Sequence, residues 1–269
     1  MISVAFAKPS RKLLSAQMPQ MAALMVGLGL IALTWAGFET RLFESVPVWV
    51  KPLKFALSLA LYYASLALVI SRLSPAVQQG WPLRLAAALA IVPGLLEAIY
   101  IFLMAGRAQA SHFNDSAPIF AALYALMGMG AFMLMVAVGL IGFLVWRDPA
   151  ARFPAGLRLG IAAGFVVSTL LTLVIGFTLG GNGGHFIGVH LPRSAQLPLL
   201  GWSGSVGDLR VPHFFGLHAM QVGPALGWMA DRRAAGSAVR WVLGGLALYG
   251  LATLALFAQA LAGLPLMAL

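Results

Sequence analysis

The stretch "ALMGMGAFMLMVAVGLIG", residues 125–142, contains no charged side chain and is rich in glycine and methionine. It lies within a longer apolar run at 118–146. About 20 consecutive apolar residues allow a helix to cross the hydrocarbon core of a bilayer, so this run predicts a transmembrane helix. Because the run is longer than the bilayer requires, we expect the helix to tilt or to project beyond the membrane.

The composition of the whole chain extends this prediction. Apolar residues make up 61% of the 269 residues, charged residues make up only 9%, and the mean hydropathy is +0.93. Soluble domains contain about 25% charged residues. A soluble chain of this length could not bury so much apolar surface in one core. The composition therefore predicts an integral membrane protein.

Seven apolar runs are long enough to cross a bilayer, and they define the expected fold. We expect an all-α integral membrane protein with a single seven-helix membrane domain over residues 1–269. The expected helices are 18–38, 55–73, 85–105, 118–146, 157–180, 212–230 and 240–262. The segment 181–211 is longer than the 2–8 residues that usually join bundle helices. Its apolar side chains favour a cap or re-entrant segment that folds back onto the helix ends.

Basic residues in the short connections set the expected orientation, since lysine and arginine flank the cytoplasmic ends of membrane helices. In a seven-span chain the richest connections fall on one side, and they carry Lys8, Arg11, Lys12, Arg72, Arg84, Arg147, Arg152, Arg158, Arg232, Arg233 and Arg240. This pattern predicts a bacterial-type inner membrane, a cytoplasmic N-terminus and a periplasmic or extracellular C-terminus. The basic residues on the outer side, which depart from the pattern, are Arg41, Lys51, Lys54, Arg107, Arg193 and Arg210.

The chain has no cysteine, which excludes disulfides, a thiolate nucleophile, iron–sulfur clusters held by cysteine and covalently attached c-type haem. The net charge of +10 is explained by arginine at the helix ends. Since no basic stripe interleaved with aromatic residues occurs, we expect no nucleic acid partner. The expected partners are the lipid bilayer and a membrane-soluble or periplasmic small molecule.

Four of the five histidines lie in two similar segments, "GHFIGVH" at 184–190 and "PHFFGLH" at 212–218. On the expected topology all five histidines lie on the outer side, together with Asn114, Asp115 and Asp208. Two histidines at i and i+5 on a helix lie on different faces, whereas a shared metal favours i+3 or i+4. The two segments are therefore not a zinc-helix motif.

Two ionisable residues are expected deeper in the membrane. Glu97 lies about 13 Å from the outer end of the third run, and His218 lies about 9 Å from the start of the sixth. Ionisable groups inside a span face protein or a water-filled cavity because exposure to lipid is costly. Gln221 extends the polar face of His218. These residues predict the floor of a site, with Glu97 and His218 acting together. The structural alternatives are a hydrogen-bonded carboxyl, an interhelical hydrogen bond of His218 and a simple Asp208–Arg210 pair.

A metal site is the leading hypothesis, because zinc or iron binds neutral histidine together with a carboxylate and leaves a position for water. The expected ligands are His112, His213 and His218, with His185 next. Glu97 or Asp208 is the expected catalytic carboxylate. The other residues expected to line the site are Arg107, Asn114, Asp115, Arg210 and Gln221. This set predicts a metal-dependent hydrolase or oxidoreductase that acts on a lipid-like, membrane-soluble substrate.

The "SHFND" segment at 111–115 and the histidines of the sixth run resemble elements of the alkaline ceramidase and adiponectin-receptor superfamily of seven-helix membrane hydrolases. The resemblance covers a handful of residues and implies a zinc ion held by three histidines near one face. That superfamily carries HxxxH near its last helix, whereas this chain has HxxxxH in its sixth run and no histidine in its seventh.

Two other functions remain open. A b-type haem requires two histidines and no cysteine, and His218 with His112 or His185 would supply these cofactor-binding ligands. The haem would lie in the outer half of the membrane. The second alternative is a transporter or small-molecule binding protein, although the sequence shows no inverted repeat of the kind found in many transporters.

Overall fold

The computed structural model describes residues 12–191, 194–198, 200–233 and 235–269. Long helices dominate the described residues, and four very short strands form two antiparallel pairs. The helices are α1 (Lys12–Trp35), α2 (Val50–Ile70), α3 (Pro75–Gln79), α4 (Trp81–Gly106), α5 (Pro118–Arg147), α6 (Ala155–Gly181), α7 (Arg210–Arg233) and α8 (Ala238–Leu261), with a 3₁₀ turn η1 (Ala235–Ser237). The strands are β1 (Leu42–Phe43), β2 (Val46–Pro47), β3 (Phe186–Ile187) and β4 (Gly207–Asp208).

Six of the described helices are long and apolar enough to cross a membrane: α1, α2, α4, α5, α6 and α8. The chain is therefore a multi-pass membrane protein. The exception among the long helices is α7, which coincides with the sixth predicted run but is more polar. Its polar and charged side chains are Arg210, His213, His218, Gln221, Asp231, Arg232 and Arg233.

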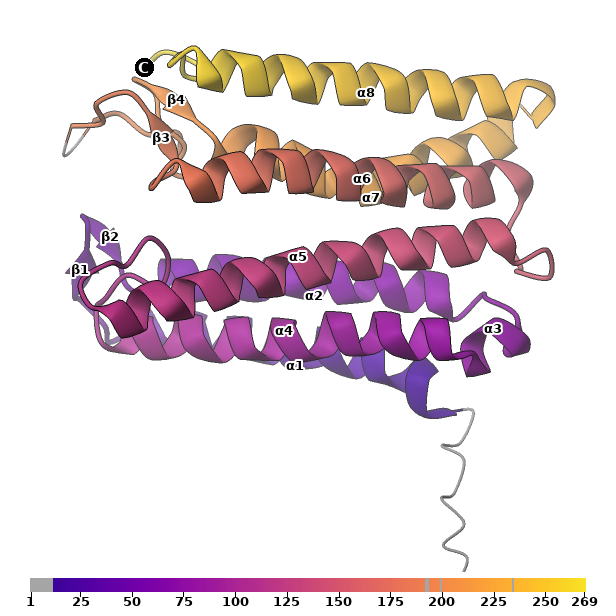
Figure 1. The fold of residues 1–269 in the computed structure, drawn as a ribbon, viewed down its shortest axis with the longest axis horizontal. Helices are drawn as coiled ribbons and strands as arrows, with labels where there is room; N and C mark the ends of the chain where they lie inside the picture. The colour runs from indigo at the N-terminus through magenta and orange to yellow at the C-terminus, as the bar shows by residue number, and fades with distance from the viewer. Residues whose placement is uncertain (1–11, 192–193, 199, 234) are drawn as a thin grey trace, which may run out of the picture.

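The seven long helices lie side by side along one bundle axis (Figure 1). Both strand pairs lie at the same end of the bundle as the C-terminus. We call this the histidine end, and it contains the connections 36–49 and 107–117 and the described residues of the connection 182–209. The opposite end, which we call the arginine end, contains the start of α1, the connections 71–80 and 148–154, and η1.

Helix α2 begins at Val50, whereas the apolar run predicted a start at residue 55. The physical reason is that Lys51 and Lys54 interrupt the apolar run but not the helix, and Pro52 suits a first helical turn because its missing N–H has no partner to lose there. The first helix similarly includes the more polar segment from Lys12, ahead of the predicted start at residue 18.

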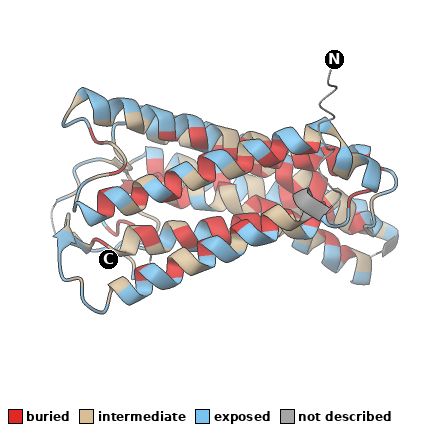
Figure 2. Cartoon of the chain, turned by 90° about the horizontal axis from the view of Figure 1, so that it is seen from below, coloured by how far each residue is buried: buried red, intermediate tan, exposed pale blue. Residues whose placement is uncertain are grey.

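The main apolar core lies in the half of the bundle near the arginine end. It combines the second halves of α2 and α5 with the first halves of α1 and α6 and most of α4. Its fully buried side chains include Tyr63, Leu66, Val138, Ile141 and Phe165. Figure 2 shows buried residues between the helices and exposed residues along their outward faces, as expected for a bundle surrounded by lipid. The histidine end is therefore not filled by this core.

Helices α6 and α7 are held together by a glycine interface, formed by Gly156, Gly160 and Gly164 of α6 with Gly223 and Gly227 of α7. A Cβ atom on Gly160 would overlap the carbonyl group of Gly223, and a Cβ atom on Gly227 would overlap the carbonyl oxygen of Gly156. Glycines four residues apart on each helix thus let the two backbones touch, as in small-xxx-small membrane interfaces. This contact fixes which face of α7 points toward α6.

Asp231 stabilises the same interface at the N-terminus of α6. Its carboxylate oxygens accept hydrogen bonds from the backbone N–H groups of Gly156 and Leu157, each at 2.7 Å. These N–H groups belong to the first turn of α6, which has no intrahelical acceptor for them. A carboxylate there also interacts favourably with the helix dipole. The last turn of α7 therefore caps the N-terminus of α6.

The glycine interface makes a specific prediction for stability. Gly160→Ala should lower the thermal unfolding temperature of the purified protein by several degrees, because overpacking a tight contact typically costs about 1–3 kcal/mol. Gly128→Ala on α5 is the matched control, because a Cβ atom there meets nothing within 4 Å. The control should be neutral or stabilising. Equal unfolding temperatures for the two variants would contradict the close backbone contact.

Candidate functional site

Loops and helix starts converge at the histidine end, and they bring together residues distant in sequence. Lys51 and Lys54 lie in the first turns of α2, His112 lies in the α4–α5 connection, His185 begins the α6–α7 connection, and Arg210 begins α7. We call these five residues the cationic cluster.

Lys51 and His112 make the contact that joins α2 to the α4–α5 connection. The Lys51 Nζ atom lies 3.2 Å from His112 Nδ1. An ammonium group can only donate, so His112 Nδ1 accepts and its proton resides on Nε2. The imidazole also packs against the rings of Phe55 and Tyr124, at centroid distances of 5.5 and 6.0 Å. Burial, and secondarily the nearby positive charge of Lys51, lower the pKa of His112 to about 3.

His185, another member of the cationic cluster, lies among aromatic rings. Its ring lies 4.1 Å from that of Phe186 and 6.3 Å from that of Phe113, between centroids. Burial is the main cause that lowers its pKa to about 4, and the charge of Arg210 contributes in the same direction. His112 and His185 are therefore neutral at pH 7 and act as hydrogen-bonding groups without adding charge.

Asp208 and Arg210 lock the α6–α7 connection onto the start of α7. Arg210 Nε and Nη2 donate to the carboxylate of Asp208, with the closest pair at 2.6 Å. The same carboxylate accepts from the backbone N–H groups of Arg210 and Ser203, each at 3.0 Å. Its side chain is fully buried. Asp208 and Arg210 thus form the simple pair that was the structural alternative to a catalytic role. Asp208 positions Arg210 and Ser203.

The described residues of the α6–α7 connection lie at the histidine end, and we call them the cap. Strand β3 pairs with β4, and Gln196 forms an isolated bridge with Ser203. The His190 ring stacks on Phe186 at 3.8 Å between centroids. The backbone N–H of Leu269 donates to the carbonyl of Gly204, so the C-terminal residue closes onto this cap.

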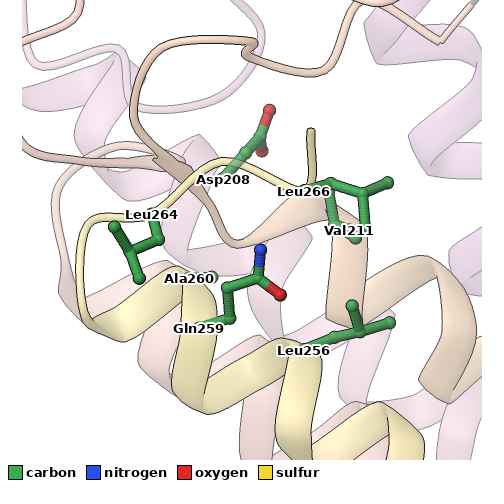
Figure 3. Close-up of a pocket in the computed structure, with 7 residues that line it drawn as sticks. All are labelled: Asp208, Val211, Leu256, Gln259, Ala260, Leu264 and Leu266. Carbon is green, nitrogen blue, oxygen red and sulfur yellow. The ribbon is translucent and has the colours of Figure 1, made fainter. Parts of the chain in front are cut away.

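Figure 3 shows a small cavity beside Asp208, between the start of α7, α8 and the C-terminal segment. Its volume of about 10 Å³ provides room for roughly one water molecule. The residues that line it are Asp208, Val211, Leu256, Gln259, Ala260, Leu264 and Leu266. This cavity is too small to hold a substrate.

His218 and Gln221 continue from the cationic cluster into the bundle. His218 Nδ1 lies 3.1 Å from Gln221 Oε1, and Gln221 Nε2 donates to Ser65 Oγ of α2 at 3.0 Å. Arg210, Phe214, His218 and Gln221 recur at helical spacing and share one face of α7. Gln221 lies eleven residues, or about 16 Å, beyond Arg210.

The facing side of α2 carries a matching polar stripe. Lys54, Ser58 and Ser65 also share one helix face, and Ser65 lies eleven residues beyond Lys54. Both helices begin at the histidine end (Figure 1), and the Gln221–Ser65 hydrogen bond joins the two stripes at the same depth. We call these two facing stripes the polar seam. Helix α7 packs mainly on α6 and α8, whereas α2 packs mainly on α1 and α4, so side chains and not backbones meet at the seam.

Glu97 lies elsewhere, inside the apolar core. Its side chain is buried, and among the described residues its Oε1 atom has no hydrogen-bond partner. Gly130 of α5 lies opposite this oxygen, and the absence of a side chain on this glycine leaves room for the carboxyl group. Among the described residues, Glu97 forms no hydrogen bond or ion pair with His218, which instead bonds Gln221. The expected joint action of Glu97 and His218 therefore has no direct contact to support it.

The remaining predicted residues are local or peripheral. His213 lies beside Gly176 of α6 and makes no described side-chain hydrogen bond. Asn114 closes its own turn by bonding Ala110 and Ser116. Arg107 is exposed and bonds Gln109, and Asp115 is exposed.

The described histidines and carboxylates lend no support to the predicted metal site. Among the residues that the structure describes, no group of three or more histidines, aspartates or glutamates lies close enough to hold a metal ion. His112 and His218 direct a ring nitrogen to Lys51 and Gln221 respectively. The predicted zinc or iron site, and the zinc site implied by the resemblance to membrane hydrolases, therefore receive no support. The haem remains a prediction, which an absorption spectrum of the purified protein tests.

Sequence reasoning named Arg210, His112, His185, His218 and Gln221 but not Lys51, Lys54 or Ser65 as site residues. A signal for the two lysines was present, because both depart from the expected cytoplasmic placement of basic residues. Ser65 gave no signal by itself, since serine is tolerated in membrane helices when it bonds its own backbone. Its hydroxyl does so here, donating to the carbonyl of Leu61 at 2.8 Å.

Comparisons with known proteins identify no relative. No protein-family model matches the chain, and no curated protein and no solved structure gives a significant match.

The lowered pKa values of His112 and His185 predict the pH dependence of stability. Below pH 6.5 the unfolded chain protonates these histidines, whereas the folded protein keeps them neutral down to about pH 4. The unfolded state then binds more protons, so stability should decrease as pH falls from 7 to 5, by up to about 1.4 kcal/mol per pH unit for each histidine.

Unfolding temperatures measured in detergent at pH 7 and pH 5 check this expectation. His112→Gln removes one of the two groups and should reduce the difference between the two pH values. An unchanged difference in this variant would show that His112 is not held neutral by its surroundings.

Proposed function

We propose that the chain is a seven-span inner-membrane protein that binds a membrane-soluble small molecule at the histidine end, along the polar seam between α2 and α7. The observation that carries the proposal is the pair of polar stripes that face each other at equal depth, joined by the Gln221–Ser65 hydrogen bond. Polar groups inside a membrane bundle are costly and usually mark a substrate or ion pathway.

The seventh span of this proposal is α7. Its 24 residues extend about 36 Å, which matches the thickness of a bilayer core with some excess. Its low hydropathy has a structural cause, because Gln221 faces Ser65 and Asp231 caps α6 within the bundle. Glycine replaces large apolar residues where α7 touches α6. A helix enclosed in this way can cross a membrane without being apolar on all sides.

Seven spans place the two ends of the chain on opposite sides of the membrane. The basic connections at the arginine end favour the cytoplasm, as the positive-inside rule predicts for a bacterial-type inner membrane. The histidine end and its cap would then face the periplasm. A ligand reaching the polar seam would enter from that side or from the outer leaflet.

A binding or carrier function fits this geometry better than the metal-dependent enzyme. The apolar core fills the arginine half of the bundle, whereas polar side chains occupy the histidine half. The carboxylates expected to be catalytic are separated: Asp208 is bonded to Arg210, and Glu97 lies within the core. The neutral histidines suit recognition of a ligand by hydrogen bonds.

Replacing the seam with apolar side chains tests the proposal. Wild-type protein incubated with a total lipid extract of its expression host and repurified should retain small molecules that mass spectrometry identifies. Ser65→Leu/Gln221→Leu should lose at least one of these species, because leucine fills the seam and removes its hydrogen bonds. Thr178→Leu is the matched control, since that exposed hydroxyl bonds only Val174 of its own helix. Identical retained species in all three proteins would contradict the proposed site.

A further inference from the structure

We propose that the ligand of the polar seam is an amphiphile with a phosphate group, and that Lys51, Lys54 and Arg210 bind the phosphate. This inference rests on the proposed function and specifies its ligand. The cationic cluster provides the headgroup site, and the exposed apolar side chains beside the seam provide contacts for the hydrocarbon part.

Lys51 is the first component of the phosphate site. It is only partly exposed, and its described side-chain hydrogen bond goes to the neutral ring of His112. The ion pairs of the described residues do not include it. An ammonium group has three N–H donors, so two remain for a ligand. A partly buried cation that contacts a neutral partner gains more from an added anion than a fully solvated one does.

Lys54 and Arg210 supply further donors from two helices. Lys54 Nζ donates to the carbonyl of Leu200 at 3.0 Å, which leaves two of its donors without a described partner. Arg210 uses Nε and Nη2 for Asp208 and Gly201, and its Nη1 remains available. The charge of Arg210 acts on both lysines, so the three groups lie within electrostatic range of one another.

The nearby carboxylates offset this positive charge only in part. Asp208 is fully buried, and its oxygens are occupied by Arg210 and Ser203. Glu44 interacts with Lys51 electrostatically but lies on the exposed turn between β1 and β2. In addition, the N-terminus of α2 has no side-chain cap and no acidic residue in its first turn. The positive end of that helix dipole therefore adds to the attraction for an anion.

The chemistry of the three cations favours phosphate. Arginine and lysine are the usual partners of phosphate oxygens, and several donors from separate elements match a group with several acceptor oxygens. His112 and His185 lie beside the cations as neutral groups. They contribute hydrogen bonds without adding to the repulsion between the cations.

The hydrocarbon part of the ligand is indicated by apolar side chains next to the polar stripes. Leu57 and Leu61 of α2 are 55% and 44% exposed, and Phe214 of α7 is 37% exposed. Leu57 and Leu61 follow Lys54 at helical spacing, on the same side as Ser58 and deeper in the bundle. A headgroup bound to the lysines would therefore direct an attached chain toward these apolar side chains.

Binding of three matched probes tests the inference. The probes are dioctanoyl phosphatidic acid, dioctanoylglycerol, which has the same chains without phosphate, and inorganic phosphate. Affinities are measured in a non-ionic detergent at low and high salt. Wild-type protein should bind phosphatidic acid at least about tenfold more tightly than dioctanoylglycerol, and salt should reduce this preference.

Charge variants assign the preference to the cluster. Lys51→Gln/Lys54→Gln should lose the preference, and Lys51→Arg/Lys54→Arg should retain it, which also separates loss of charge from misfolding. Arg232→Gln/Arg233→Gln is the control, because it removes two exposed cations from the arginine end. Competition by inorganic phosphate alone would identify a soluble phosphate compound as a source of the ligand, whereas its absence would identify a lipid.

Two outcomes would overturn the inference. One is equal affinity of wild-type protein for phosphatidic acid and dioctanoylglycerol. The other is a preference that survives unchanged in Lys51→Gln/Lys54→Gln. If both probes then bound equally well and Ser65→Leu/Gln221→Leu abolished their binding, the phosphate site would be wrong while the proposed binding function would stand. If neither probe bound to wild-type protein, the phosphate inference would be rejected, and the lipid-extract experiment would decide the proposed function.

Discussion

The backbone contact between α6 and α7 determines the orientation of the most polar long helix in the bundle. Gly223 and Gly227 of α7 meet glycines of α6 so closely that no side chain fits between them. Gln221 and Ala225 precede these glycines by two residues, which corresponds to about 200° around an α-helix. Fixing the glycine face on α6 therefore turns the opposite face, with His218 and Gln221, toward α2. The polar seam follows from this constraint.

The two halves of the bundle differ in what fills them. Large apolar side chains such as Phe165 and Leu66 pack the half near the arginine end. At the histidine end, connecting segments bring cations, neutral histidines and aromatic rings together, and the pair formed by the buried Asp208 and the partly exposed Arg210 holds the cap in place. Under the proposed function, the packed half of the bundle is the base for a binding site at the histidine end. A charged headgroup at the surface and a chain extending inward match the order of side chains along α2.

The membrane class and most of the helices could be predicted from the sequence, because a helix needs a long apolar run to cross the hydrocarbon core of a bilayer. Six of the seven predicted spans meet that requirement, and the sixth predicted run, α7, remains a proposed span. Arg210, His112 and Gln221 were named in advance because polar residues near a membrane interior are informative. The predicted metal lacked support because ligand geometry depends on which helices touch, and sequence spacing does not report this. The seam needed both α2 and α7 and could not be recognised from either run alone.

The central claim is that α2 and α7 face each other through their polar stripes, and cross-linking tests it most directly. The chain contains no cysteine, so introduced pairs react without background. Ser65→Cys/Gln221→Cys should be linked in membranes by a short bis-maleimide as efficiently as the reference pair Phe215→Cys/Tyr249→Cys, which joins α7 to α8. Efficient linkage of the reference pair with none between positions 65 and 221 would contradict the account.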